Sequence, residues 1–209
     1  MAARLLTNTT FLLLPPLLLL LVATAASAAT SSSTTASKSF VKTSCRKATY
    51  PSLCYSSLSP SASSIKSNPW KLCRTAMTVS LNSAHKAKAA FSSMLKSKSL
   101  TKAEKAAVKQ CRDTMDDSID QLKQSANIMS RIIQDQSSKS SSYSTSEMEF
   151  KMSNVKTYMS GAITDDSTCT DGLEEEPVRA SLKKRILKLE SAVERLTSNG
   201  LSLINTLKY

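Results

Sequence analysis

Four segments of this chain place apolar side chains at steps of three and four residues, the spacing that brings them onto one face of an α-helix. The segments cover about residues 70–96, 102–136, 146–168 and 178–208. In the last of them the stripe consists of Leu182, Ile186, Leu189, Val193, Leu196, Leu203 and Leu207. The whole sequence contains only three glycines, so turns and phosphate-binding loops that need a positive φ are scarce. The pattern therefore predicts an all-α protein.

Helix-start signals lie at the beginnings of these segments. Asn68 precedes Pro69 before the first segment, and Thr101 followed by Glu104 forms a capping-box pattern at the second. Short links between long amphipathic helices favour antiparallel neighbours. We therefore expect an up-down-up-down four-helix bundle over residues 69–209.

The N-terminal part of the chain has the features of a secretory leader. Arg4 is followed by an apolar run and then by small residues up to Ala28, which predicts a signal peptide over residues 1–28. A membrane anchor is the alternative, but two prolines interrupt the run, which is shorter than the roughly 20 residues that span a bilayer. Residues 29–38 are rich in Ser, Thr and Ala and are expected to be disordered. The mature protein is expected to be secreted and extracellular, without a membrane segment.

Five cysteines lie beyond this leader, so at least one stays outside any intramolecular bridge. Cys45 and Cys54 flank a Tyr-Pro pair, and their spacing favours a bridge that staples a short hairpin. Cys111 and Cys169 lie on the inward stripes of neighbouring helices, which favours a second bridge, although spacing alone leaves other arrangements open. Cys73 is then the free cysteine, buried as inert packing material. The lack of paired Cys-x-x-Cys spacing speaks against a metal site.

Residues 39–209 are expected to form one folded domain, since their length suits a single domain and they contain no internal repeat. The stapled unit at residues 39–68 is too small to form a core of its own. We expect it to be an N-terminal helical hairpin that packs against the bundle at residues 69–209.

Side chains arranged for catalysis are not found in the sequence. His85, the single histidine, lies in a segment rich in Ala and Lys. The pairs Asp116-Asp117 and Asp165-Asp166 are adjacent in sequence, so their side chains point about 100° apart on a helix and do not converge as an acid and a base. We expect neither enzymatic activity nor a cofactor.

The net charge of +12 favours contact with anions. Outside the cell these anions are acidic polysaccharides or acidic protein surfaces and not nucleic acid, and a solvated lysine-rich surface without a ligand is the alternative. Against this basic background, Asp113, Asp117 and Asp120 share one outward face of the second segment. That face is either a docking surface for a cationic partner or a solvated face with local ion pairs to Lys109 and Lys123.

Several short motifs are distinctive in combination. They are the Cys45 to Cys54 unit with Tyr50-Pro51 and Ser57-Leu58, the Cys111 helix, Met152-Ser153-Asn154-Val155, Thr168-Cys169-Thr170-Asp171-Gly172 and Leu196-Thr197-Ser198-Asn199. Together they resemble the plant invertase and pectin methylesterase inhibitor family, over almost the whole mature chain. The resemblance implies a four-helix bundle with an N-terminal helical hairpin, two disulfides and one free cysteine, in agreement with the pairings that spacing favours.

The resemblance also implies a function, which is inhibition of plant pectin methylesterase by a stoichiometric, non-covalent complex that covers the pectin-binding cleft. The implied contacts are Asp113, Asp117, Asp120, Thr168 and Asp171. No catalytic domain follows Tyr209, which favours a free-standing inhibitor over the pro-region of an esterase. Inhibition of cell-wall or vacuolar invertase is one alternative, although the Pro-Lys-Phe tripeptide of invertase-directed members is missing. A basic wall protein that binds anionic pectin without inhibiting an enzyme is the other.

Overall fold

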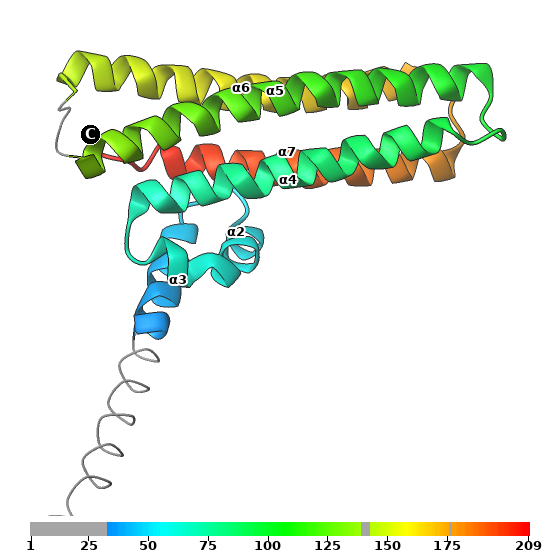
Figure 1. Ribbon diagram of the computed structural model, residues 1–209. Coiled ribbons are helices and arrows are strands. Elements are labelled where there is room, and N and C mark those ends of the chain that lie inside the picture. Colours follow the sequence, from blue (N-terminus) through cyan, green and yellow to red (C-terminus); the bar gives the residue numbers. More distant parts are fainter. Residues whose placement is uncertain (1–32, 139–142, 176) are drawn as a thin grey trace, which may run out of the picture.

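The computed structural model describes residues 33–138, 143–175 and 177–209. Within this part of the chain every regular element is a helix, and no strand is formed. Long helices lie side by side, and a smaller helical unit packs against the side of this bundle near one of its ends (Figure 1). The predicted all-α fold is confirmed.

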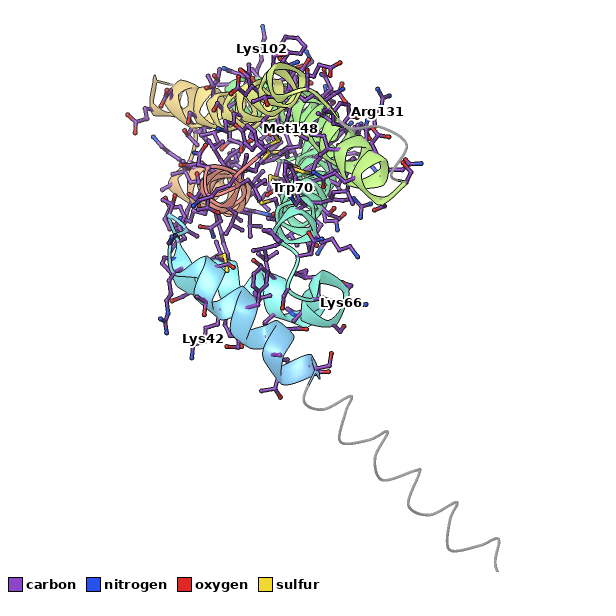
Figure 2. All side chains as sticks on the ribbon, turned by 90° about the vertical axis from the view of Figure 1, so that its left-hand side faces the viewer. Lys42, Lys66, Trp70, Lys102, Arg131 and Met148 are labelled. Carbon is purple, nitrogen blue, oxygen red and sulfur yellow. A yellow bond between two sulfur atoms is a disulfide. The ribbon has the colours of Figure 1, made fainter. Side chains whose placement is uncertain are left out.

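The long helices surround a common core. They are α4 (Pro69–Leu95), α5 (Lys102–Ser138), α6 (Thr145–Glu175) and α7 (Ala180–Ile204). Helices α4 and α6 each pack against both α5 and α7, so α5 and α7 occupy opposite corners of the bundle. Figure 2 looks along the bundle and shows the side chains of all four helices converging on its centre. This is the expected up-down-up-down arrangement.

The predicted start signals cap their helices. The Asn68 side chain accepts a hydrogen bond from the backbone N–H of Lys71 at 3.0 Å, at the start of α4. At the start of α5, the Glu104 N–H donates to the Thr101 hydroxyl at 3.2 Å, and the Thr101 N–H donates to the Glu104 carboxylate at 3.0 Å. The first turns of α4 and α5 are therefore both capped by residues that the sequence identifies.

Helix α6 continues beyond its predicted end at Thr168 as far as Glu175. The buried stripe of the helix explains the extension. Asp166, Cys169 and Leu173 follow one another at three- and four-residue steps, and each is only 1% exposed. The burial of Cys169 and Leu173 thus holds the last turns of α6 against the bundle.

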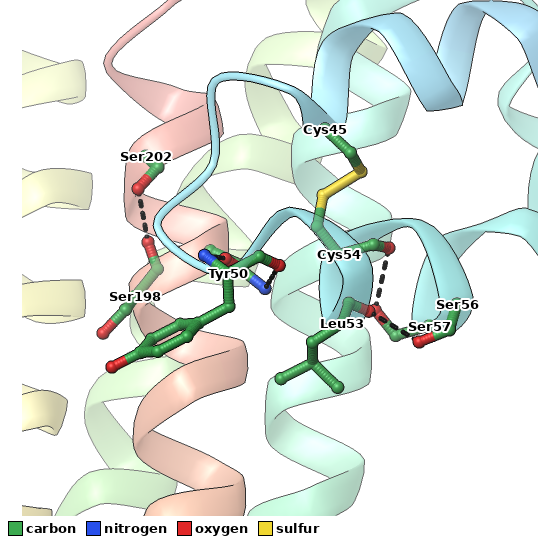
Figure 3. Close-up of a disulfide and its surroundings, with 9 residues drawn as sticks. Cys45, Tyr50, Leu53, Cys54, Ser56, Ser57, Ser198 and Ser202 are labelled. Atoms are coloured by element: carbon green, nitrogen blue, oxygen red, sulfur yellow. Dashed lines mark hydrogen bonds between the residues drawn. A yellow bond between two sulfur atoms is a disulfide. The ribbon is translucent and has the colours of Figure 1, made fainter.

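The small helical unit is the predicted N-terminal hairpin. It consists of a helix over residues 33–45, α2 (Pro51–Leu58), a 3₁₀ turn at Ser59–Ser61 and α3 (Ala62–Ile65). A disulfide joins Cys45 to Cys54 across the hairpin (Figure 3). The Asn199 side chain of α7 clamps the hairpin to the bundle, because its amide oxygen accepts from the Tyr50 N–H at 2.7 Å and its NH₂ group donates to the Tyr50 carbonyl at 3.1 Å.

Composition predicts disorder over residues 29–38, and here the structure differs, because residues 33–38 are helical. The Ser37 hydroxyl donates to the carbonyl of Ser33 at 2.9 Å, and Ser37 is buried, so a polar side chain is accommodated within the helix. Residues 29–32 and the signal peptide expected at residues 1–28 lie outside the described residues. In the described ranges no helix has both the length and the apolar character needed to cross a bilayer.

The core of the bundle is rich in sulfur. Methionines that are fully buried line it at positions Met77, Met115, Met129, Met152 and Met159. A second disulfide, Cys111–Cys169, joins α5 to α6 with 4.7 Å between the two Cα atoms and is called the α5–α6 disulfide below. Cys73 is free and buried. Burial raises the pKa of its thiol to about 12, so the thiol stays protonated and packs as an apolar group.

Candidate functional site

A close seam joins α5 and α6, and the α5–α6 disulfide crosses it. On α6, Gly161 and Gly172 are three helical turns apart and hence lie on the same face. A Cβ at Gly161 would lie 1.9 Å from Oε1 of Gln121, and a Cβ at Gly172 would lie 2.9 Å from Nε2 of Gln110. The two glycines therefore let glutamine side chains of α5 lie directly against the α6 backbone.

Thr168 and Asp171 lie on the exposed side of α6. With Thr164 they are spaced four and three residues apart, and all three residues are exposed. The Thr168 hydroxyl donates to the Thr164 carbonyl at 2.9 Å, which leaves its oxygen able to accept a hydrogen bond from a partner. The structure thus brings these two predicted contacts together on one strip of α6.

Asp165 links this strip to α5, although it is not among the contacts that the sequence predicts. Its carboxylate accepts a hydrogen bond from Nε2 of Gln121 at 2.7 Å. Burial raises the pKa of Asp165, the hydrogen bond from Gln121 lowers it, and the negative charge of Asp117 raises it further. Asp117 is therefore close enough to repel Asp165 across the seam. We call Asp117, Gln121, Asp165, Thr168 and Asp171 the α5–α6 face.

The other two predicted contacts, Asp113 and Asp120, have cationic neighbours on their own helix. Asp113 accepts from the Arg112 guanidinium at 2.6 Å and lies 3.3 Å from Nζ of Lys109. The Arg112 hydrogen bond lowers the pKa of Asp113. Asp120 lies 3.1 Å from Nζ of Lys123. These are the local ion pairs that the solvated-face alternative predicts. Of the three aspartates on this face of α5, Asp117 is the one that makes no ion pair with a described residue.

One cluster among the described residues has the composition of a metal site. The sulfur atoms of Cys111 and Cys169 and the carboxylate of Glu190 lie within 4.8 Å of one another. Both sulfurs are bonded in the disulfide, so this cluster offers a single donor atom and cannot hold a metal in the oxidised protein. Asp165 and Asp166 diverge as predicted, since the first lies at the seam and the second is buried in the core.

Comparisons with known proteins agree with this architecture. A profile of the plant invertase/pectin methylesterase inhibitor family matches residues 39–203. Pectinesterase inhibitor 4 of Arabidopsis thaliana is 37% identical over 167 residues, which is 79% of this chain and 79% of that protein. The 21 kDa protein of Daucus carota is 35% identical over 169 residues, which is 81% of this chain and 83% of that protein. A crystal structure of a mutant form of a pectin methylesterase inhibitor from Arabidopsis has a TM-score of 0.59 at 16% identity, with 78% of this chain and 94% of that chain covered.

The fold and the α5–α6 face define a disulfide-braced helical bundle that presents a rigid polar surface. The chain belongs to the plant invertase/pectin methylesterase inhibitor family. The resemblance of its short motifs to this family is thereby confirmed, and the protein is of an inhibitor class and not an enzyme. The structural likeness at 16% identity supports the fold alone.

Proposed function

We propose that this protein is a secreted inhibitor of plant pectin methylesterase that acts in the extracellular space of the cell wall. The names of its relatives support the esterase as the target, and the missing Pro-Lys-Phe tripeptide speaks against invertase. The structural observation that carries the proposal is the α5–α6 face, which is polar, largely exposed and braced by a disulfide. The predicted leader at residues 1–28 supplies the route of export.

The proposed mechanism is steric occlusion of the pectin-binding cleft by a stoichiometric, non-covalent complex. A braced surface needs little ordering on binding, so less of the interaction free energy is lost to entropy. Asp117, Thr168 and Asp171 offer hydrogen-bond acceptors to the enzyme. Asp113 and Asp120 release the neighbouring cations of α5 and form ion pairs with cations of the enzyme instead.

The test is a titration of purified pectin methylesterase and, in parallel, of cell-wall invertase with the mature protein. We expect esterase activity to fall linearly to an equivalence point at one inhibitor per enzyme, and invertase activity to stay unchanged. Loss of invertase activity alone would assign the other target of the family. Full activity of several plant esterase isoforms in the presence of excess protein would reject the proposal.

A charge reversal tests the α5–α6 face. Asp117→Lys replaces its unmatched carboxylate on α5 with a cation and is expected to weaken inhibition by roughly tenfold or more. Glu149→Lys is the matched control, because it makes the same charge change at an exposed position of α6 about 24 Å along the helix from Asp165. Equal inhibition by both variants and the wild type would exclude this face as the contact.

A further inference from the structure

The solvent-facing side of α7 carries cations and no exposed carboxylate. Lys184, Lys188 and Arg195 are spaced four and seven residues apart, which places them within about 40° of one another around the helix. All three are exposed, as is the neighbouring Arg185. The two acidic residues of α7 are buried or half-buried. We call Lys184, Arg185, Lys188 and Arg195 the α7 stripe.

The α7 stripe differs from α5 in lacking counter-ions. On α5, lysine and arginine side chains pair with neighbouring aspartates. Among the described residues, no carboxylate lies within ion-pair distance of any cation of the α7 stripe. Lys184 and Lys188 repel each other at i, i+4. The result is an unneutralised positive field that extends about 16 Å from Lys184 to Arg195.

A cavity of about 310 Å³ opens at the start of the stripe. Its walls come from the end of α4, the α4–α5 connection and the first turns of α7. The polar lining includes Ser97, Ser99, Ser181 and Arg185, and the apolar lining consists of Met94, Leu100 and Leu182. Arg179 also lines the cavity, but its guanidinium is held by a buried glutamate and by the Ser99 carbonyl. Arg185 therefore provides the unpaired cation among the described residues of this wall, beside serine hydroxyls. A cation beside hydroxyl groups suits a sugar that carries a carboxylate.

We propose that the α7 stripe and its cavity bind a polyuronide, a linear polysaccharide whose sugar carboxylates are free of ester groups. Charge complementarity favours this ligand, because a linear chain of regularly spaced anions matches a row of cations that have no carboxylate partner among the described residues. Arg195 at the far end of the row also lies over the Tyr50 ring, 5.4 Å from its centroid, which leaves its charge without a counter-ion. A carboxylated sugar also fits the combination of Arg185 and hydroxyls in the cavity.

The position of the stripe leaves the proposed inhibitory surface accessible. Helices α5 and α7 occupy opposite corners of the bundle, so the outer side of α7 faces away from the outer side of α5. A polysaccharide on the α7 stripe and an enzyme on the α5–α6 face can therefore be bound at the same time. The binding of a polyuronide does not depend on the proposed inhibition, and each proposal can fail without the other.

The experiment compares binding of the mature protein to polygalacturonate, to highly methylesterified pectin and to phosphatidylserine vesicles at about 0.15 M salt. We expect binding to polygalacturonate that weakens with added salt and is at least tenfold weaker for the esterified polymer. The double variant Lys184→Gln/Lys188→Gln is expected to lose roughly tenfold in affinity. Its matched control is Lys105→Gln/Arg131→Gln, which removes the same charge from exposed positions of α5 and should change affinity less than about twofold.

Three results would overturn the proposal. Equal losses in the two double variants would show that only net charge matters. Vesicles that bind as tightly as polygalacturonate would make a lipid surface the ligand. Loss of esterase inhibition by Lys184→Gln/Lys188→Gln, with polysaccharide binding retained, would assign the stripe to the enzyme. Lost polysaccharide binding with unchanged inhibition and an unchanged helical circular dichroism spectrum is the supporting result.

Discussion

Two places in this bundle bury carboxyl groups, and they treat the charge in opposite ways. One is the α5 end at Glu104, which is 2% exposed. The other is the centre of the bundle, where Asp166 of α6 and Glu190 of α7 are each 1% exposed. The three groups are almost equally hidden from solvent, but Glu104 lies at the rim of the bundle and the other two lie in its centre, so both depth and partners set them apart.

Glu104 is fully paired. Its carboxylate accepts from Nε of Arg179 at 2.6 Å, from Nη2 of Arg179 at 2.8 Å and from the Thr101 N–H at 3.0 Å. The Arg179 hydrogen bond is the main reason that the pKa of Glu104 falls to about 2. The ion pair ties the start of α5 to the residue before α7, because Arg179 also donates to the carbonyl of Ser99 at 2.9 Å.

Asp166 and Glu190 have no such partner. Neither carboxyl group makes a well-formed hydrogen bond with a described residue, although the buried hydroxyl of Ser118 on α5 lies beside Asp166. Burial raises the pKa of Asp166 to about 8 and that of Glu190 to about 9. The Ser118 hydroxyl lowers the pKa of Asp166 against this effect, and repulsion from Asp165 and Glu194 raises it further. Repulsion from Asp166 likewise adds to the shift of Glu190.

The comparison shows that a buried carboxyl group stays ionised where a cation lies within ion-pair distance and stays neutral where none does. Arg179 is half-exposed, so it stays hydrated at the rim of the bundle while it reaches Glu104. No arginine or lysine of the described chain makes an ion pair with Asp166 or Glu190 in the interior. These two residues enter the fold as neutral acids, and a neutral acid is favoured by low pH.

The largest expected effect is a loss of stability between pH 5 and pH 8. The pKa values of Asp166 and Glu190, about 8 and about 9, lie above their ordinary values near 4. Their contribution to the free energy of unfolding is therefore complete below about pH 4 and is lost as the pH rises towards 8 and 9. The slope is about 1.4 kcal/mol per pH unit for each group, or about 4 kcal/mol over three units. Urea unfolding at a series of pH values from 5 to 8 measures this change in the free energy of unfolding.

A neutral variant isolates the source of this slope. Asp166→Asn with Glu190→Gln should flatten the dependence on pH, whereas the exposed control Glu149→Gln with Asp171→Asn should keep it. An unfolding midpoint of the wild type that stays constant from pH 5 to pH 8 would contradict the assignment of neutral acids to the core.

The next effect concerns the α5–α6 disulfide, which lies beside Glu190. Cys111→Ser with Cys169→Ser opens a bridge between positions 58 residues apart, which costs about 4 kcal/mol in the chain-entropy description. Removing the hairpin bridge, which spans nine residues, should cost about 2.5 kcal/mol. Opening the α5–α6 disulfide also admits water near Glu190, so the pH slope should become shallower. Chemical denaturation of both serine variants over the same pH series checks the two expectations, and an unchanged slope would contradict the second.

A smaller effect with the opposite pH dependence is expected at Arg179. Because the pKa of Glu104 is lowered to about 2, the stability from its ion pair is present above about pH 4 and is lost as the pH falls towards 2. Arg179→Gln should lower the Tm at pH 7 by several degrees, and its difference from the wild type should shrink at pH 2.5. The loss is moderate because Arg179 is half-exposed and water replaces part of the interaction. A Tm difference that is the same at both pH values would show that packing, and not charge, is responsible.

The smallest effect is expected at Cys73, a third buried group that stays neutral. Its pKa of about 12 keeps the thiol protonated at pH 8, so thiol reagents should label the native protein only when the bundle opens. Labelling should therefore be slow at pH 5, and at pH 8 it should accelerate by more than the larger thiolate fraction of the unfolded chain explains, because the core is then less stable. Rapid labelling at pH 5 would show that the α4 face of the core is open to solvent.

Local signals made most of the fold predictable. The periodic stripes gave the four helices, and the capping pattern at Thr101 and Glu104 gave the start of α5, because both depend on residues close together in sequence. Arg179 lies 75 residues from Glu104, and no local pattern links them. Helical periodicity alone does not decide whether Leu189 or Glu190 faces the core, and the sequence analysis assigned Leu189 to the apolar stripe. The structure buries Glu190, in step with Ile186 and Val193, and leaves Leu189 half-buried.

The candidate face was less accessible to prediction, because it depends on the register between two helices. The exposure of Asp117, Thr168 and Asp171 follows from helical period. The position of Asp165 against Gln121 does not, although Gly161 and Gly172, three turns apart in a chain with few glycines, were a usable signal. A single helix does not reveal which neighbour such glycines face.

The clamp of Asn199 on Tyr50 has a consequence for how this architecture can vary. Asn199 recognises the N–H and the carbonyl of residue 50, groups that every amino acid except proline presents. Neutral drift can therefore exchange the tyrosine and keep both hydrogen bonds, at the cost of the contact between its ring and the Arg195 guanidinium. Position 199, in contrast, has to keep a side chain that both donates and accepts at that distance.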